Sequence, residues 1–132
     1  MSSSYKFFAH EIFDENIREF FKRYENFQKA LLTNLEIARS NPFSGKAMHS
    51  LPPKFRQKVF RLWIGDREDF RFIYYVNKDS CSVLGIYVTL EPRANFSYEK
   101  SDWLDRLQMI VDDLGNPEKF AILNTEGAVK KL

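Results

Sequence analysis

Three arginines lie within or at the end of strand-like runs of this sequence. Arg61, Arg71 and Arg93 stand among aromatic and branched residues, which favour extended structure. Guanidinium groups can stabilise the charge that develops on a reacting phosphate, and neighbouring rings can stack on nucleic-acid bases. An ordinary charged strand surface is the alternative, and the pattern alone favours it, because acidic residues stand nearby for pairing. Those acidic residues are Asp66, Glu68, Asp69 and Glu91.

The charges of the chain are unevenly distributed although they nearly cancel. The 132 residues carry 20 Lys and Arg against 18 Asp and Glu, and a net charge of +2 argues against binding nucleic acid through overall charge. Residues 54–71 hold six basic and three acidic side chains, whereas residues 99–118 hold six acidic and two basic ones. This asymmetry predicts a basic face and an acidic C-terminal element.

Cysteine and histidine are too few to suggest a metal site. Cys81 is the only cysteine, and its apolar neighbours predict a buried thiol. His10 and His49 are isolated and are expected to be plain surface or loop residues. We therefore expect no metal and no cofactor. The start MSSSYKFF lacks an apolar signal core, and no window is apolar enough to span a membrane, so we expect a cytoplasmic protein without membrane contact.

A sheet must position the arginines, and the pattern predicts one in the middle of the chain. Three strand-like runs and two polar turns occur, the runs at residues 58–64, 70–76 and 81–90 and the turns at 65–69 and 77–80. They predict a three-stranded antiparallel meander with helices packed on one side. The third run is apolar almost throughout, as expected of a central strand covered on both faces.

A short strand and two helical segments are expected before the meander. Residues 5–10 predict a first strand at a sheet edge, and Asp14 stands where a helix N-cap belongs. Apolar side chains at helical spacing continue to Ala38, and Pro42 excludes further helix. A break near Asn26 would produce a helical hairpin, and one long bent helix is the alternative.

A last helix is expected near the C-terminus. Ser101 can cap it, an apolar stripe at helical spacing follows, and Gly115 stands at its stop. The elements together predict an α+β fold, in which an N-terminal strand and a helical hairpin pack on a small antiparallel sheet and a C-terminal amphipathic helix is added. We expect one domain over residues 1–132, with a core at 5–98 and a helical extension at 99–132.

The order β–α–α–β–β–β, with arginines at these points of the last three strands, resembles the RelE/ParE superfamily of bacterial toxins. The residues that carry the resemblance are Gly45-Lys46 through Leu51-Pro52, VFRL at 59–62, FRFIY at 70–74, and residues 83–93. The similarity covers about residues 5–98, and the FRFIYYV strand is its most specific motif. The resemblance implies a small antiparallel sheet on an N-terminal helical hairpin and the toxin part of a type II toxin–antitoxin pair.

The RelE-like branch, which the resemblance favours, consists of ribosome-dependent ribonucleases that cleave mRNA without a metal. A 2′-hydroxyl attacks its own 3′ phosphate and leaves a 2′,3′-cyclic phosphate. Carried over by position, Arg71 and Arg61 would stabilise the phosphate. Arg93 would lie near the leaving group, and Tyr98 would stack on a base or relay a proton. The implied partners are a cognate antitoxin, the ribosome and mRNA.

The sequence departs from the RelE-like pattern at Val59, where that branch usually has the basic residue proposed as general base. Lys58 is adjacent but belongs to the other face by strand alternation, so Lys54 and Glu91 are the substitutes. Both lysines are assigned to RNA binding. Arginine stays protonated near neutral pH and is a poor base. Two alternatives therefore stay open, namely a ParE-like inhibitor that binds DNA gyrase and a non-catalytic binding member of the fold. A homodimer stays open as well.

Overall fold

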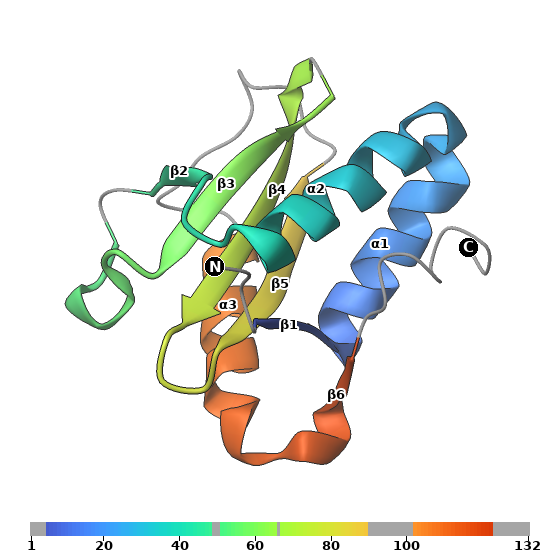
Figure 1. Cartoon of the computed structure of the whole chain (residues 1–132). Helices are drawn as coiled ribbons and strands as arrows, with labels where there is room; N and C mark the ends of the chain where they lie inside the picture. The colour runs from blue at the N-terminus through green and yellow to red at the C-terminus, as the bar shows by residue number, and fades with distance from the viewer. Residues whose placement is uncertain (1–4, 49–50, 66, 90–101, 123–132) are drawn as a thin grey trace.

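A six-stranded mixed sheet with helices on both faces forms the centre of this α+β fold (Figure 1). The computed structural model describes residues 5–48, 51–65, 67–89 and 102–122. In chain order the elements are β1 (Lys6–His10), α1 (Glu11–Arg23), η1 (Glu25–Phe27), α2 (Gln28–Ser40), β2 (Lys46–Ala47), η2 (Pro53–Phe55), β3 (Val59–Ile64), β4 (Arg67–Asn77), β5 (Ser82–Thr89), α3 (Asp102–Asp112), η4 (Asp113–Gly115), η5 (Pro117–Lys119) and β6 (Phe120–Ile122), where η marks a short 3-10 helix.

The strands follow the order β2-β3-β4-β5-β1-β6 across the sheet. Antiparallel pairing of β3 with β4 and of β4 with β5 confirms the predicted meander. β1 runs parallel to β5 and antiparallel to β6, so the expectations of a purely antiparallel sheet and of an edge position for the first strand are wrong. β6 takes that edge. Its three residues carry too little alternation for the sequence to predict a strand there.

Both turns of the meander differ in detail from the prediction. β4 already begins at Arg67, and Gly65 has a φ of +63°, which glycine adopts without strain, so the first turn is shorter than expected. In the second turn, the Asn77 side chain accepts a hydrogen bond from the backbone N–H of Asp79 at 3.1 Å. Cys81 lies at the end of this turn with a φ of +51° and is partly exposed, so the prediction of a buried thiol is wrong.

Two helices, and not one long bent helix, form the layer on one face of the sheet. α1 ends because Tyr24 leaves helical geometry, with φ −133° and ψ 62°, and the single turn η1 leads into α2. This confirms the hairpin alternative. His10 is the N-cap of α1, since its side chain accepts a hydrogen bond from the N–H of Ile12. The assignment of Asp14 as the cap is therefore wrong, and Asp14 pairs with Arg18 in the first turns of α1.

The sheet separates two hydrophobic cores. α1 and α2 cover one face and α3 covers the other (Figure 1), so the expectation of helices on one side only is wrong. β5 contacts both α1 and α3, which confirms a central strand covered on both faces. The first core includes Phe7, Phe13, Phe20, Leu31, Phe60, Phe72 and Tyr74. The second core includes Phe55, Val59, Ile73, Tyr75, Ile86, Trp103 and Leu107.

α1 is attached to β5 by a close contact and by a pair of hydrogen bonds. A Cβ atom at Gly85 would lie 2.3 Å from the ring of Phe13, so only glycine fits beneath the helix at this point. Asn16 on α1 donates its amide to the Val88 carbonyl at 3.1 Å and accepts a hydrogen bond from the Val88 N–H at 2.5 Å. The Asn16 side chain thus replaces a neighbouring strand, because β1 pairs with β5 only as far as Leu84.

Candidate functional site

Arg61, Trp63 and Arg71 form a group on the face of the sheet that α3 covers. Trp63 of β3 faces Arg71 of β4, and Arg61 faces Ile73, so strand alternation turns all three toward the second core. The guanidinium carbon of Arg61 lies 4.1 Å from the Trp63 ring centre, and that of Arg71 lies 5.4 Å from it. Both distances fit cation–π contacts. We call these three residues the arginine–tryptophan cluster.

The members of the arginine–tryptophan cluster differ in exposure. Arg71 is only 2% exposed, whereas Arg61 and Trp63 are partly exposed. An arginine keeps its proton even when it is buried, so a full positive charge lies within the sheet face. A phosphate that approaches from solvent meets Arg61 first and reaches Arg71 only if the covering atoms move. Arg61 is therefore the member best placed for direct contact with a substrate.

Two further residues predicted to take part in catalysis are Arg93 and Tyr98. Both lie outside the described residues, as does Glu91, one of the substitutes for the general base. Of the four residues assigned to catalysis, the structure thus brings Arg61 and Arg71 together.

The position of the missing general base is part of the second core. Val59 is fully buried and faces Tyr75 on β4. Lys54 and Lys58 lie in the segment that leads into β3, and both side chains are exposed. The Lys54 amino group lies 5.1 Å from the centre of the Phe55 ring. Both lysines are therefore accessible for binding, and neither is shown to act as a base.

Sequence reasoning missed a further cation, in addition to Arg61 and Arg71, on the same face of the sheet. Arg106 of α3 has its guanidinium carbon 5.1 Å from the ring of Tyr87, and Tyr87 pairs with Ile73 in the sheet. Arg106 stands next to Leu107, which is fully buried against the sheet. The sequence held a signal for this position, because Arg106 is the one basic residue in the helical range 102–112.

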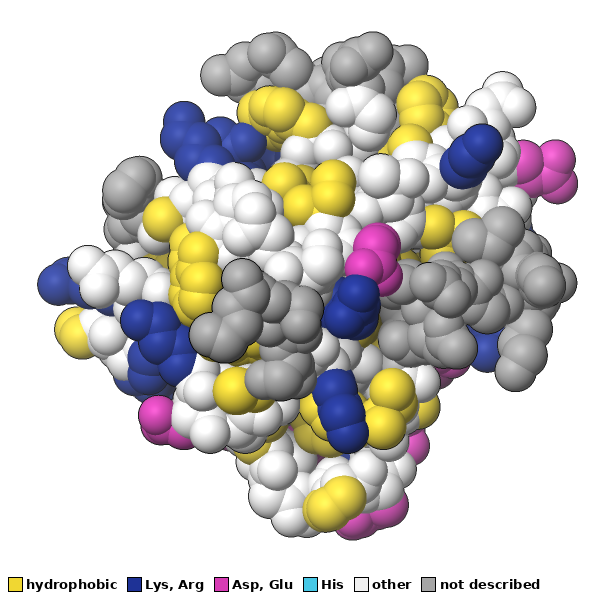
Figure 2. Space-filling model, viewed as in Figure 1, with side chains coloured by type: hydrophobic (Ala, Val, Ile, Leu, Met, Phe, Trp, Pro, Cys, Tyr) yellow, Lys and Arg dark blue, Asp and Glu magenta, His cyan; other side chains and the backbone are white. Residues whose placement is uncertain are grey.

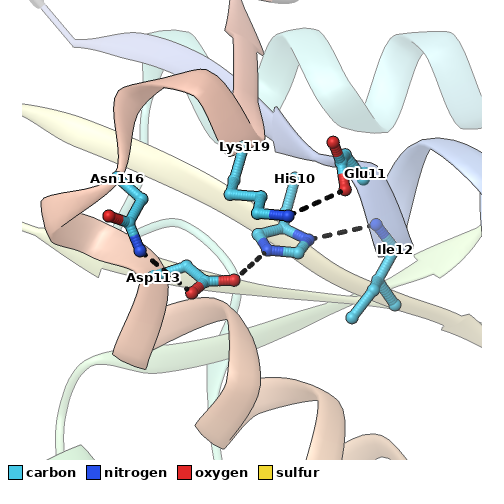
Figure 3. A network of polar contacts seen from close by, with 6 residues as sticks. All are labelled: His10, Glu11, Ile12, Asp113, Asn116 and Lys119. Carbon is cyan, nitrogen blue, oxygen red and sulfur yellow. Dashed lines mark hydrogen bonds and ion pairs between the residues drawn. The ribbon is translucent and has the colours of Figure 1, made fainter.

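A hydrogen-bonded pair of a buried histidine and a partly exposed aspartate joins the start of α1 to the C-terminal region (Figure 3). His10 is 3% exposed, so its expected place on the surface is wrong. Its Nδ1 accepts from the Ile12 N–H, and its Nε2 lies 2.7 Å from a carboxylate oxygen of Asp113. A backbone N–H can only donate, so the ring proton resides on Nε2 and is donated to Asp113. The hydrogen bond from His10 is the main cause that lowers the pKa of Asp113.

This histidine is engaged at both nitrogens and is not a free base. Phe120 packs edge-on against the ring at 5.1 Å, and the Lys119 amino group lies 3.8 Å from the Glu11 carboxylate across the same junction (Figure 3). The network therefore fastens η4, η5 and β6 to the β1–α1 junction. It acts as a structural attachment.

The described part of the chain holds neither a candidate metal-binding cluster nor a candidate membrane-spanning helix. No group of three or more potential metal-binding His, Cys, Asp or Glu side chains occurs among residues 5–48, 51–65, 67–89 and 102–122. Within those same ranges no helix is long and apolar enough to cross a membrane.

Comparison with known proteins adds no relative. No family model, no curated protein and no solved structure matches the chain. Function must therefore be inferred from the chain itself.

Proposed function

We propose that the chain is the toxin of a toxin–antitoxin pair and cleaves mRNA on the ribosome. One observation carries the proposal: Arg61 and Arg71, on neighbouring strands, both lie within cation–π distance of Trp63. Two guanidinium groups on neighbouring strands supply positive charge for a reacting phosphate, and the Trp63 ring, which both contact, offers a surface for a base. Among the described residues the order β1-α1-α2-β3-β4-β5, in which only the short elements η1, β2 and η2 intervene, is the order that the resemblance to the RelE/ParE superfamily implies, and it supports the proposal.

In the proposed reaction, a 2′ oxygen forms a bond to its own 3′ phosphorus while the bond from that phosphorus to the next 5′ oxygen breaks. The 2′ proton passes to a base, and the 5′ oxygen takes up a proton. Arg61 and Arg71 stabilise the charge that accumulates on the phosphate oxygens. Arg93 neutralises the leaving oxygen, and Tyr98 stacks on a base or relays the proton. The general base is not assigned to a residue.

A second candidate is a member of the same fold that binds RNA without cleaving it. Two observations favour it: Arg71 is 2% exposed, and fully buried Val59 stands where a base is expected. Such a protein keeps Arg61 and the exposed lysines for binding but lacks a group that removes the 2′ proton. The gyrase inhibitor stays the alternative from the sequence, and no described contact favours it.

Mapping of mRNA 5′ ends after induction in bacteria separates these functions. Cuts within codons of translated messages support the nuclease. Growth arrest with a DNA-damage response and intact mRNA supports the gyrase inhibitor, and intact mRNA without that response supports the binding protein.

Arg61→Gln tests the site in the purified protein with ribosomes and message. We expect cleavage to fall by about 100-fold, as for the loss of one charge-stabilising donor. The matched control is Arg18→Gln, because the Arg18 guanidinium is exposed on α1 and pairs only with Asp14 among the contacts given above. Full-rate cleavage by Arg61→Gln, with unchanged thermal unfolding, would show that the arginine–tryptophan cluster is not the site.

A further inference from the structure

A pocket with basic walls lies where β3 begins and β4 ends. Its volume is about 220 Å³, and its lining comes from the segment before β3, the end of β4, the β4–β5 turn and Phe43 after α2. None of the three residues of the arginine–tryptophan cluster lines it. Figure 2 shows Lys and Arg side chains at the left of the molecule, over the segment that leads into β3 and the β4–β5 turn. The pocket is thus a separate feature of the basic surface.

Positive charge dominates the wall of this pocket. Arg56, Lys58 and Lys78 line it against a single acidic residue, Asp79, and all three cations are exposed. The Val76 N–H donates to the Lys58 carbonyl at 2.8 Å, which fixes this segment to β4. The basic side chains therefore converge from two segments that the sheet holds together, so an anion is the favoured occupant.

The backbone between two of these cations has an uncommon conformation. Gln57, which also lines the pocket, has a φ of +63°, in the left-handed region that side chains other than glycine and asparagine seldom adopt. Backbone strain of this kind costs free energy and occurs preferentially at binding and active sites. The strain is compatible with a segment shaped for a ligand.

Tyr75 supplies a hydroxyl group without a hydrogen-bond partner among the described residues. Its side chain is 6% exposed, packs edge-on against Phe55 at 6.5 Å, and lines the pocket. Burial, and then the charge of Asp79, raise the pKa of Tyr75. The hydroxyl therefore stays neutral and can donate a hydrogen bond to an anion. The neighbouring Tyr74 differs, because its hydroxyl donates to the Pro42 carbonyl at 2.8 Å and accepts from the Gly45 N–H.

We propose that this pocket binds a phosphate of single-stranded RNA, with the base of that nucleotide against Phe43. Cations and a neutral hydroxyl donor match phosphate oxygens, and Phe43, 43% exposed on the pocket wall, offers a ring for stacking. The choice of RNA as the source of the phosphate rests on the proposed function.

Fluorescence anisotropy with a short labelled single-stranded RNA tests this pocket without any need for cleavage. We expect Lys78→Gln and Tyr75→Phe each to lower affinity several-fold, and Lys58→Gln combined with Lys78→Gln to lower it at least tenfold. Each lost lysine should reduce the slope of log K against log salt by about 0.7, the value for one phosphate contact in a single strand. Lys22→Gln on α1, an exposed lysine outside the pocket, is the control with unchanged affinity and slope.

The same titrations also separate the pocket from the cleavage reaction. RNA affinity and salt slope that stay the same in both lysine variants overturn the proposal. Competition by inorganic phosphate at the concentration at which RNA competes also overturns it, because the pocket is then a general anion site. Binding that depends on Lys78 in a protein that does not cut mRNA supports the pocket and contradicts the nuclease, so the two failures are distinguishable.

Discussion

The two faces of the sheet are built from the same strands and differ in what they bury. Toward α1 and α2, β3 and β4 contribute apolar side chains and Tyr74 to the first core. Toward α3, they contribute Ile73 and Tyr75 to the second core, but also the arginine–tryptophan cluster. Burial of the charge of Arg71 is costly, and hydrophobic replacement of such groups often stabilises a protein. The first face thus serves stability, and the second combines a core with groups that we interpret as functional.

The largest effect should follow from crowding the first face. In Gly85→Ala the new Cβ would approach three ring atoms of Phe13 at 2.3, 2.5 and 2.6 Å, and overpacking of this kind costs about 3 kcal/mol. Denaturant unfolding measures the loss. Gly115→Ala is the control, since a Cβ there meets nothing within 4 Å, and its free energy of unfolding should change by less than about 0.5 kcal/mol.

A double variant decides whether Phe13 causes the effect of Gly85→Ala. Adding Phe13→Leu shortens the ring that the new methyl group meets, so the two changes together should cost less than their sum. Strict additivity would mean that the close approach of β5 to α1 does not set the requirement for glycine.

A smaller effect should distinguish the two adjacent tyrosines, which face opposite sides. Tyr74→Phe removes the donor to the Pro42 carbonyl and the acceptor of the Gly45 N–H, at a cost of about 2 kcal/mol for buried groups left unpaired. Tyr75→Phe removes a hydroxyl without a protein partner among the described residues and should leave the free energy of unfolding nearly unchanged. Thermal and denaturant unfolding measure both variants, and an equal loss of stability in Tyr74→Phe and Tyr75→Phe would contradict this contrast.

Tyr74 should also behave differently from an exposed tyrosine at alkaline pH. Burial raises the pKa of Tyr74 to about 12. The neutral phenol is thus favoured by folding, and its stabilisation is complete below the ordinary value of 10.0 and falls as the pH rises toward the folded value. The difference in stability between the wild type and Tyr74→Phe should therefore narrow in this alkaline range.

The smallest effect should appear at acid pH, where the C-terminal region attaches to the first strand. The pKa of Asp113 lies below its ordinary value of 3.8, mainly because His10 donates a hydrogen bond to it. The stabilisation is complete above that ordinary value and is lost as the pH falls through the lower, folded value. The melting temperatures of the wild type and Asp113→Asn should therefore converge below about pH 4. Asp112→Asn, one residue earlier on α3, is the control, and an equal gap at every pH would rule out the titration of Asp113 as the cause.

Much of the fold was predictable because its signals are local. Alternation along residues 58–90 predicted the meander, and helical spacing predicted α1, α2 and α3. The cap of α1 was misassigned to Asp14, because a histidine side chain at the end of a strand gives no strong capping signal. For the site, alternation along one strand placed Arg61 and Trp63 on the same face, and the register between β3 and β4 then added Arg71, which faces Trp63.

The sequence by itself determined the types of most elements and the shared face of Arg61 and Trp63 within one strand, since both depend on periods of a few residues. Only the tertiary structure decided that β1 lies inside the sheet, that α3 covers the arginine-bearing face and that Arg71 is buried. It also joined Lys58 to Lys78 around Tyr75. These results depend on contacts between residues far apart in the chain, and no local period records which distant segment supplies the partner.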